Sequence, residues 1–277
     1  MVYIVRYCDR HKILLCFVNL FIFLTKNIMN NKIFNHIVKK LHETWNLPKH
    51  SEIRESLGAD TVLDSLPWTP VKKQKFKSDL EGTFGVVIEV VGTVEQLVDR
   101  TDDRYLAWFF GEAWKPRTDI YHWTGWRIAD EINKNGPVKV LDVGCGYNPF
   151  KERIPNLVGI DPYNNCADFM IDILDYNVEP ESFDHVIALG SINFNSRADV
   201  EIRFKKTVEL LKPGGRLWMR ANPGLDHDGV QTPNKGPWVE IFPWNFEVAH
   251  ELAKTHGLTL ELMKKDQDRL FFLFVKN

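Results

Sequence analysis

Short apolar runs alternate with amphipathic stretches from about Ile120 to the end of the chain. Between Ala198 and Lys212, apolar residues recur every three or four positions, which predicts a helix that Gly214 and Gly215 end. The same reading predicts further helices to about residue 133 and at about 244–256, with strands at 138–143, 157–160, 169–173, 183–189, 216–221, 258–263 and 270–275.

Strands that alternate with helices in this way predict an α/β fold, with a mostly parallel sheet covered on both faces. The last two strands are separated by only a short charged stretch, so we expect them to form an antiparallel pair. Ligands of such sheets bind at the carboxyl ends of the strands.

The preceding part of the chain, to about residue 118, has helical and mixed patterns without a chemical motif. Val86–Val91 predicts a strand, and Thr93 with Gln96 predicts a capping box that opens a helix. We therefore expect three parts, namely an apolar N-terminal extension over residues 1–29, an accessory or cap segment over 30–118, and the α/β domain over 119–277.

Residues 13–24 are almost wholly apolar and follow Arg6, Arg10 and Lys12. Three interpretations stay open: an extension upstream of a start at Met29, a core or interfacial helix, and a signal or anchor. The apolar run is too short to span a bilayer comfortably, so no stable membrane association is expected.

Composition narrows the possible classes of protein only a little. The 277 residues are 44% hydrophobic, which indicates a globular protein. The formal net charge of −2 gives no overall positive electrostatic field that would attract nucleic acid. Four cysteines without paired metal spacing or a disulfide framework fit a reducing compartment, and we expect the cytoplasm.

The stretch Val140–Phe150 reads Val-Leu-Asp-Val-Gly-Cys-Gly-Tyr-Asn-Pro-Phe, an apolar strand that runs into a glycine-rich turn. Gly144 and Gly146 permit a sharp turn and let a ligand approach main-chain amides. The strand at 157–160 ends in Asp161, whose carboxylate at that place can accept hydrogen bonds from ribose hydroxyls. Two strand ends therefore point to one nucleoside.

Four segments in this order resemble the class I S-adenosylmethionine-dependent methyltransferases: 140–146, 158–161, 167–173 followed by 182–187, and the turn at 211–217. The resemblance implies a Rossmann-like, doubly wound sheet of seven strands, mostly parallel and with an antiparallel C-terminal strand. It also implies S-adenosyl-L-methionine as the cofactor.

Carried over by position, the resemblance places Gly144, Cys145 and Gly146 close to the methionine portion of the cofactor. It implies that Asp142 orients that turn or reaches the amino group through water, and that Asp161 holds both ribose hydroxyls. Adenine would be bound by Asp172 and the amide of Ile173, and the cofactor ammonium by the carbonyl of Leu189 or Gly190.

The chain departs from this family after the glycine turn, where a full helix normally follows. Only residues 147–156 separate the turn from the next strand, and they include Pro149 and Pro155, so that helix is about one turn long or missing. A dinucleotide would need a third glycine and a helix N-terminus for its pyrophosphate. The departure therefore counts against NAD more than against a methyl donor.

Methyl transfer from a sulfonium needs an aligned acceptor, and a base only where the acceptor must lose a proton early. Our candidates are Asn193 after the fourth strand, and Asp226 with His227 after the fifth. The triplet Asp226–Asp228 could instead bind a metal or form an ordinary polar loop; we assign no metal ligands.

The acceptor is the open question. The Asn/Asp-Pro-Pro-aromatic run of enzymes that methylate base or amide nitrogens is absent after the fourth strand, so a small-molecule acceptor is favoured. Two alternatives remain: a nucleic-acid or protein methyltransferase that uses the accessory segment and the lysines at 72–77, and a non-catalytic cofactor-binding module. Candidate pocket aromatics, each with a packing role as its alternative, are Tyr105, Trp108, Phe109, Phe110, Trp114, Trp238, Phe242 and Trp244.

Overall fold

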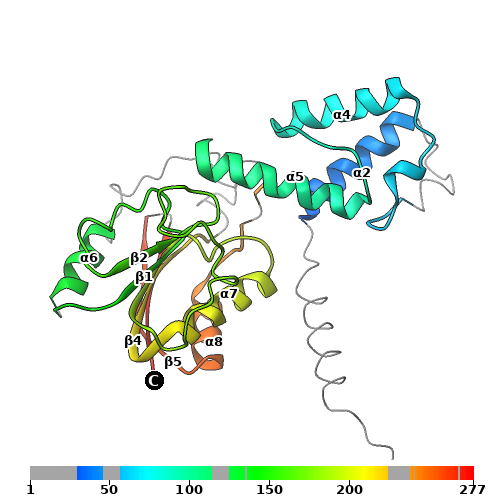
Figure 1. Ribbon diagram of the computed structural model, residues 1–277. Coiled ribbons are helices and arrows are strands. Elements are labelled where there is room, and N and C mark those ends of the chain that lie inside the picture. Colours follow the sequence, from blue (N-terminus) through cyan, green and yellow to red (C-terminus); the bar gives the residue numbers. More distant parts are fainter. Residues whose placement is uncertain are drawn as a thin grey trace, which may run out of the picture.

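The computed structural model describes residues 30–45, 57–113, 125–134, 136–223, 238–239, 241–267 and 269–277. Over these ranges, a sheet with helices on its faces lies beside a second group of helices (Figure 1). The helices of that group are α2 (Asn31–Trp45), α4 (Pro70–Phe84) and α5 (Val94–Trp108), and we call residues 30–113 the helical unit. The predictions for residues 1–29 lie outside the described residues.

The sheet has six strands in the order β2-β1-β3-β4-β6-β5. Neighbours among β1, β2, β3 and β4 pair in parallel, whereas β6 is antiparallel to both β4 and β5. The predicted parallel sheet with an antiparallel C-terminal strand is thus confirmed. The strands are β1 (Val140–Val143), β2 (Leu157–Ile160), β3 (Phe183–Leu189), β4 (Leu211–Ala221), β5 (Leu258–Asp266) and β6 (Arg269–Lys276).

The seven-stranded prediction was wrong for the described residues, because the expected strand at 169–173 is reduced to one bridge. Phe169 pairs in parallel with Ile160, and the ladder then ends. β2 itself ends at Ile160, and the chain turns directly after the bridge, where the amide of Ile171 donates to the carbonyl of Phe169 at 3.1 Å.

Helices cover both faces of the sheet. On one face, α6 (Gly125–Asn133) packs through Ile128 and Ile132 against apolar side chains of β1, β3 and β4. On the other face, α7 (Arg197–Leu210) and α8 (Phe246–Thr255) pack against the alternate side chains of the same strands. Alternate side chains of each strand therefore pack into two different cores, which agrees with the predicted sheet covered on both faces.

No helix separates β1 from β2, which confirms the prediction that this connection is about one turn long or missing. The chain forms a single turn in which the amide of Ile154 donates to the carbonyl of Phe150 at 2.9 Å. The ring of Phe150 packs against Gly125 so closely that a Cβ there would lie 1.7 Å from the ring, so the start of α6 occupies the space above this turn.

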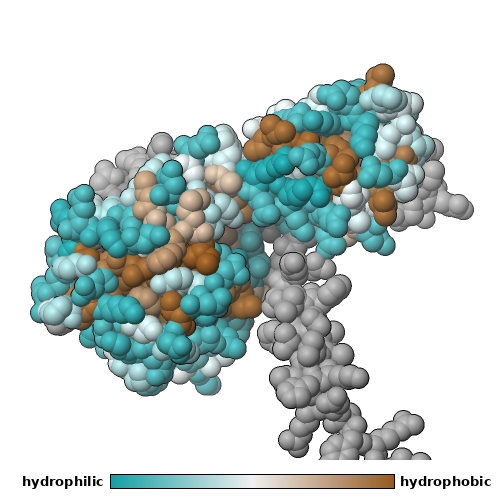
Figure 2. Space-filling model, in the orientation of Figure 1, coloured by the Kyte–Doolittle hydropathy of each residue, from teal (hydrophilic) through white to brown (hydrophobic). Residues whose placement is uncertain are grey.

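The helical unit has its own core, with Ile37, Phe76 and Leu97 among its fully buried residues. The predicted capping box is present at the start of α5, where Thr93 accepts from the amide of Gln96 at 3.2 Å. Figure 2 shows apolar surface on this unit as well as on the α/β part. Within the described ranges, no helix combines the length and apolarity needed to cross a bilayer.

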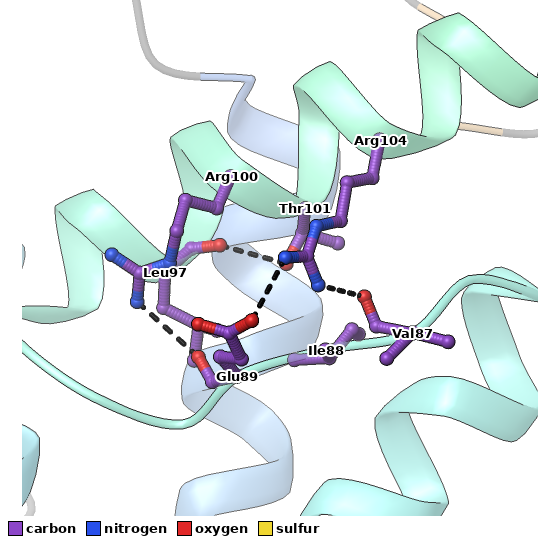
Figure 3. Close-up of a pocket in the computed structure, with 7 residues that line it drawn as sticks. All are labelled: Val87, Ile88, Glu89, Leu97, Arg100, Thr101 and Arg104. Atoms are coloured by element: carbon purple, nitrogen blue, oxygen red, sulfur yellow. Dashed lines mark hydrogen bonds and ion pairs between the residues drawn. The ribbon is translucent and has the colours of Figure 1, made fainter.

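The predicted strand at 86–91 is wrong, because this stretch is extended but forms no ladder. Its backbone is bound by side chains of α5 instead, as Figure 3 shows. Arg100 donates to the carbonyls of Glu89 and Val91, and Arg104 donates to that of Val87. Two guanidinium groups thus supply the donors that a neighbouring strand would have supplied.

The helical unit is attached to the segment that follows β4. Trp238 packs its ring against Phe84 of α4, with ring centroids 4.7 Å apart. Asn30 donates to the carbonyl of Trp238 at 2.8 Å, and Lys32 donates to that of Val239 at 3.2 Å. Apolar and polar contacts therefore both hold this segment to the helical unit.

Candidate active site

The glycine turn lies at the carboxyl edge of the sheet, between the ends of β2 and β3. Gly144 and Gly146 both have positive φ, +67° and +55°, which residues with a Cβ rarely adopt. The amide of Gly144 donates to the carbonyl of Ile160 at 2.8 Å, so the turn is tied to the end of β2. A Cβ on Gly144 would lie 2.4 Å from that of Ser191, the second residue after β3, so the turn also contacts this neighbouring loop.

Asp161 is buried at the end of β2, and its carboxylate organises the surrounding loops. Its Oδ2 accepts from the amide of Gly146 at 3.0 Å, and its Oδ1 accepts from the amides of Tyr163 and Asn164 at 2.8 and 3.0 Å. A carboxylate has about four lone-pair sites. These three bonds leave one acceptor position, on Oδ2, for a further donor such as a hydroxyl.

Asp142 is the buried acidic residue of β1, two positions before Gly144. Its Oδ2 has no hydrogen-bond partner among the described residues. Burial, followed by the nearby charge of Asp161, raises the pKa of the Asp142 carboxyl to about 7. An acceptor that is buried without a donor is costly, so the site favours a ligand that brings an N–H or a positive charge.

The thiol of Cys145 lies in the same turn and is buried. Burial and then the charges of Asp142, Asp161 and Asp168 raise the pKa of this thiol far above its usual value. It is therefore protonated and unreactive at neutral pH. What Cys145 offers a ligand is its position in the backbone of the turn.

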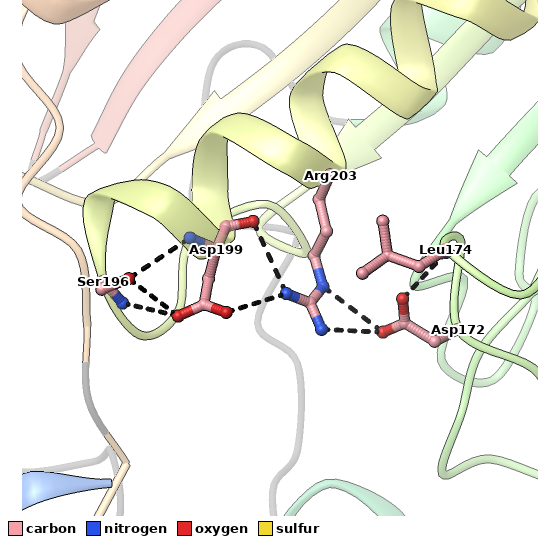
Figure 4. A network of polar contacts seen from close by, with 5 residues as sticks. All are labelled: Asp172, Leu174, Ser196, Asp199 and Arg203. Carbon is pink, nitrogen blue, oxygen red and sulfur yellow. Dashed lines mark hydrogen bonds and ion pairs between the residues drawn. The ribbon is translucent and has the colours of Figure 1, made fainter. Parts of the chain in front are cut away.

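Asp172 lies in the loop beyond the bridge at Phe169 and faces the start of α7 (Figure 4). Its Oδ2 lies 3.3 Å from one guanidinium nitrogen of Arg203. The other terminal nitrogen of that group lies 3.7 Å from the carboxylate of Asp199. Asp199 in turn caps α7 together with Ser196. The candidate adenine-binding carboxylate is thus oriented by an arginine, which no sequence motif indicated.

Ile173 follows Asp172 and is buried in the larger core. Leu189 ends β3, and its carbonyl accepts from the guanidinium of Arg220 at 3.1 Å. Gly190 has a φ of +105° and turns the chain out of the strand. The carbonyl expected to meet a cofactor ammonium therefore already faces one cation, with its second lone pair left for another donor.

Asn193, a candidate catalytic residue, is buried between the loops that follow β3 and β4. Its side-chain Oδ1 accepts from the amide of Asn222 at 2.9 Å, and its carbonyl accepts from the amide of Phe242 at 2.8 Å. It therefore holds these two loops together. Asp226, His227 and Asp228 lie outside the described residues, so their catalytic assignment stays a prediction.

The predicted aromatic residues divide between core and site. Tyr105 and Phe109 are buried against Val239, and Trp244 is buried in the sheet core, where its indole donates to the carbonyl of Ile192 at 2.9 Å. Phe110 instead reaches the loops at the carboxyl edge of the sheet. Its ring stacks on that of Tyr163 at 5.9 Å, a contact that sequence reasoning missed because α5 and β2 are far apart along the chain.

Comparisons with known proteins bear on the fold alone. No protein-family model matches the sequence, and no curated protein sequence matches it. The chain is similar to the solved structure of 1,6-didemethyltoxoflavin-N1-methyltransferase from Burkholderia thailandensis, at 14% identity over 78% of this chain and 94% of that one, with a TM-score of 0.45.

Two further solved structures to which this chain is similar are also those of methyltransferases. They are the N-methyltransferase NodS from Bradyrhizobium japonicum (20% identity, 58% of this chain and 90% of that one, TM-score 0.41) and an S-adenosylmethionine-dependent methyltransferase from Mesorhizobium loti (13%, 55% and 97%, TM-score 0.42).

Proposed function

We propose that this protein is a class I S-adenosyl-L-methionine-dependent methyltransferase. The observation that carries the proposal is the meeting of three features at one sheet edge: the left-handed glycine turn, the ordered carboxylate of Asp161, and the buried Oδ2 of Asp142 without a partner. Each feature fits a different part of this one cofactor.

The cofactor is a cation with an ammonium group, a ribose and an adenine. Asp142 fits the ammonium, because a positive charge or an N–H would satisfy its buried oxygen. Gly146 has open space where a Cβ would lie, which lets the methionine portion approach closely, and the remaining position on Oδ2 of Asp161 fits one ribose hydroxyl. Asp172 and the amide of Ile173 remain our candidates for adenine.

The bound cofactor would supply an electrophilic methyl group on its sulfonium. The residues of this chain would align the acceptor and exclude water from the transfer. In our proposal, Asn193 positions the loops after β3 and β4, where the acceptor would lie. His227, oriented by Asp226, would accept a proton from an acceptor that must lose one.

A small-molecule acceptor is the favoured substrate class, with residues 119–277 as the methyltransferase domain and 30–118 as its cap. The lysine run of α4 gives the nucleic-acid alternative little support, because Lys73 lies 3.0 Å from Asp64 and Lys77 lies 3.7 Å from Glu81. These two charges are thus partly balanced within the helical unit rather than presented together to phosphates.

Isothermal titration with S-adenosylmethionine and S-adenosylhomocysteine tests the cofactor assignment, with NAD as the control ligand. We expect saturable binding of the first two and none of NAD. Incubation with methyl-labelled cofactor and cell extract, fractionated into small molecules, nucleic acid and protein, then locates the acceptor. Absence of cofactor binding would overturn the proposal, and binding without any labelled product would favour the non-catalytic module.

A further inference from the structure

A π-helical turn, η2 (Phe109–Ala113), continues α5 and brings one residue of the helical unit to the candidate active site. The ring of Phe110 lies 5.9 Å from that of Tyr163, at an interplanar angle of 16°, and 5.1 Å from that of Phe194, at 64°. Tyr163 follows β2, and Phe194 follows β3. Phe110 therefore contacts two loops that belong to different strands.

The order of the strands shows what lies between these two loops. β1 is the middle strand of β2-β1-β3, so the glycine turn that follows β1 lies between the loops after β2 and β3. We therefore expect a ring that contacts the loops on both sides of this turn to lie close to Gly144–Gly146. The backbone of Gly111 is also close, because a Cβ there would lie 3.1 Å from the carbonyl oxygen of Tyr163.

The position of Phe110 is set by the packing of its neighbours. Tyr105 and Phe109, on the same helical continuation, are buried against Val239. The segment at Trp238 and Val239 is in turn hydrogen-bonded to the start of α2, as described above. The π-helical turn is consequently held from behind, and π-helical turns are frequent at functional sites.

The surroundings of Tyr163 are acidic. Burial, and then the carboxylates of Asp103, Asp102 and Asp172, raise the pKa of its phenol well above the usual range. Two of these carboxylates come from α5 of the helical unit, and the third from the α/β part. Negative charge from both parts, offset in part by Arg203, therefore lies near Tyr163.

We propose that Phe110 is a binding residue for the cofactor, and that it closes the site above the glycine turn by bridging Tyr163 and Phe194. The helical unit then completes the cofactor site, and the cofactor enters and leaves by displacing this ring. This inference rests on the proposed function, because it takes S-adenosylmethionine as the ligand of the glycine turn.

The test compares Phe110→Ala and the conservative Phe110→Leu with a matched control, Phe246→Ala. Phe246 is a partly exposed phenylalanine of α8 that packs on Phe272, away from the glycine turn. The measurements are the affinity for S-adenosylhomocysteine by titration and the release rate of tritium-labelled S-adenosylmethionine chased with unlabelled cofactor. Melting temperatures verify that each variant is folded.

We expect Phe110→Ala to release the cofactor about fivefold faster than the wild type, which corresponds to the loss of about 1 kcal/mol from an aromatic contact. The release rate of Phe110→Leu should lie between those of Phe110→Ala and the wild type, and the rate of Phe246→Ala should match that of the wild type. Phe194→Ala should also speed release, and the double variant Phe110→Ala/Phe194→Ala should add less than the sum of the two single effects.

Two outcomes separate this inference from the proposed function. If the wild type binds the cofactor and Phe110→Ala releases it at the same rate, Phe110 does not close the site, whereas the proposed function stands. If the wild type does not bind the cofactor at all, the proposed function fails first and this inference fails with it. Should Phe110→Ala not fold, the Phe110→Leu and Phe194→Ala release rates decide the question.

Discussion

The backbone amide of Gly146 donates to Oδ2 of Asp161 across 3.0 Å, which joins the turn after β1 to the end of β2. The two residues are fifteen positions apart, with no helix between them. In the absence of that helix, the carboxylate of Asp161 and the carbonyl of Ile160 hold the turn in place. The acidic residue at the end of β2 is therefore a structural anchor of the turn as well as a candidate ligand for ribose.

Asp161→Asn tests both roles. The substitution keeps the shape but turns one acceptor oxygen into an N–H donor, so either the amide of Gly146 or those of Tyr163 and Asn164 lose their partner. Loss of a hydrogen bond to a charged group costs about 1.5–3 kcal/mol, so we expect roughly 10- to 100-fold weaker cofactor binding by titration. Asp175→Asn, at an exposed turn residue, is the control and should bind as the wild type does.

Gly144→Ala should destabilise the protein, because alanine has to adopt a φ of +67° and its Cβ meets that of Ser191 at 2.4 Å. The left-handed conformation alone costs roughly 1–2 kcal/mol, which urea unfolding can measure. Adding Ser191→Gly should restore the portion of the free energy of unfolding that is lost to the clash. The portion lost to the left-handed φ should remain lost. Gly82→Ala, in α4 with open space around it, should be neutral or stabilising; equal losses in both single variants would contradict this account.

Asp142 should make cofactor binding depend on pH. Its pKa in the free protein is raised to about 7, so below pH 7 the carboxyl is mostly neutral and attracts an ammonium group weakly. Affinity for S-adenosylhomocysteine should therefore increase as the pH rises from about 6 to 7.5, and binding at pH 6 should release a proton. Titration in buffers of different ionisation enthalpy measures that proton.

Asp142→Asn is the matched variant for this pH effect. It keeps the shape of the side chain but cannot ionise, so the proton release at pH 6 should vanish and the affinity should lose its dependence on pH in this range. If the wild type releases no proton at pH 6, Asp142 does not face the ammonium group of the ligand.

His185 should make stability depend on pH. The indole of Trp218 donates to its Nδ1 at 3.2 Å, and burial, with the charge of Arg216, lowers the pKa of His185 to about 4. Since this value lies below the unfolded one, stability is complete above about pH 6.5 and is lost as the pH falls from there to about 4, by at most about 3 kcal/mol. Urea unfolding at each pH measures the loss.

His185→Gln should remove most of that pH dependence, because glutamine retains an acceptor but does not bind a proton in this range. His250→Gln changes an exposed histidine of α8 and should leave the slope as it is in the wild type. A slope that survives in His185→Gln would assign the effect to another group.

Arg203→Ala should weaken cofactor binding by up to about tenfold, because Asp172 loses the guanidinium that orients its carboxylate. Both side chains are partly exposed, so solvent screens the pair and a larger effect is not expected. Lys205→Ala, an exposed neighbour on α7 that pairs weakly with Glu209, is the control. Identical affinities in the two variants would show that Arg203 does not act on adenine through Asp172.

Most of the α/β fold follows from local pattern. The strands at 157–160 and 183–189 and the antiparallel C-terminal pair agree with prediction, because apolar alternation and glycine or proline punctuation are properties of neighbouring residues. The strands expected at 86–91 and 169–173 failed for one shared reason. An apolar run becomes a strand only if a partner ladder continues beside it. Here arginine side chains bind the backbone at 86–91, and at Phe169 the partner strand ends and the chain turns.

The sequence by itself determined the glycine turn, the acidic residue within β1, the acidic residue after β2, and the shortened connection between these strands, since all depend on residues close together along the chain. Only the tertiary structure decided that Arg203 orients Asp172, that Asn193 ties two loops together, and that the ring of Phe110 packs against those of Tyr163 and Phe194. These contacts join residues separated by some thirty to more than eighty positions. No local pattern encodes them, because they depend on the order of the strands and on the packing of the helical unit against them.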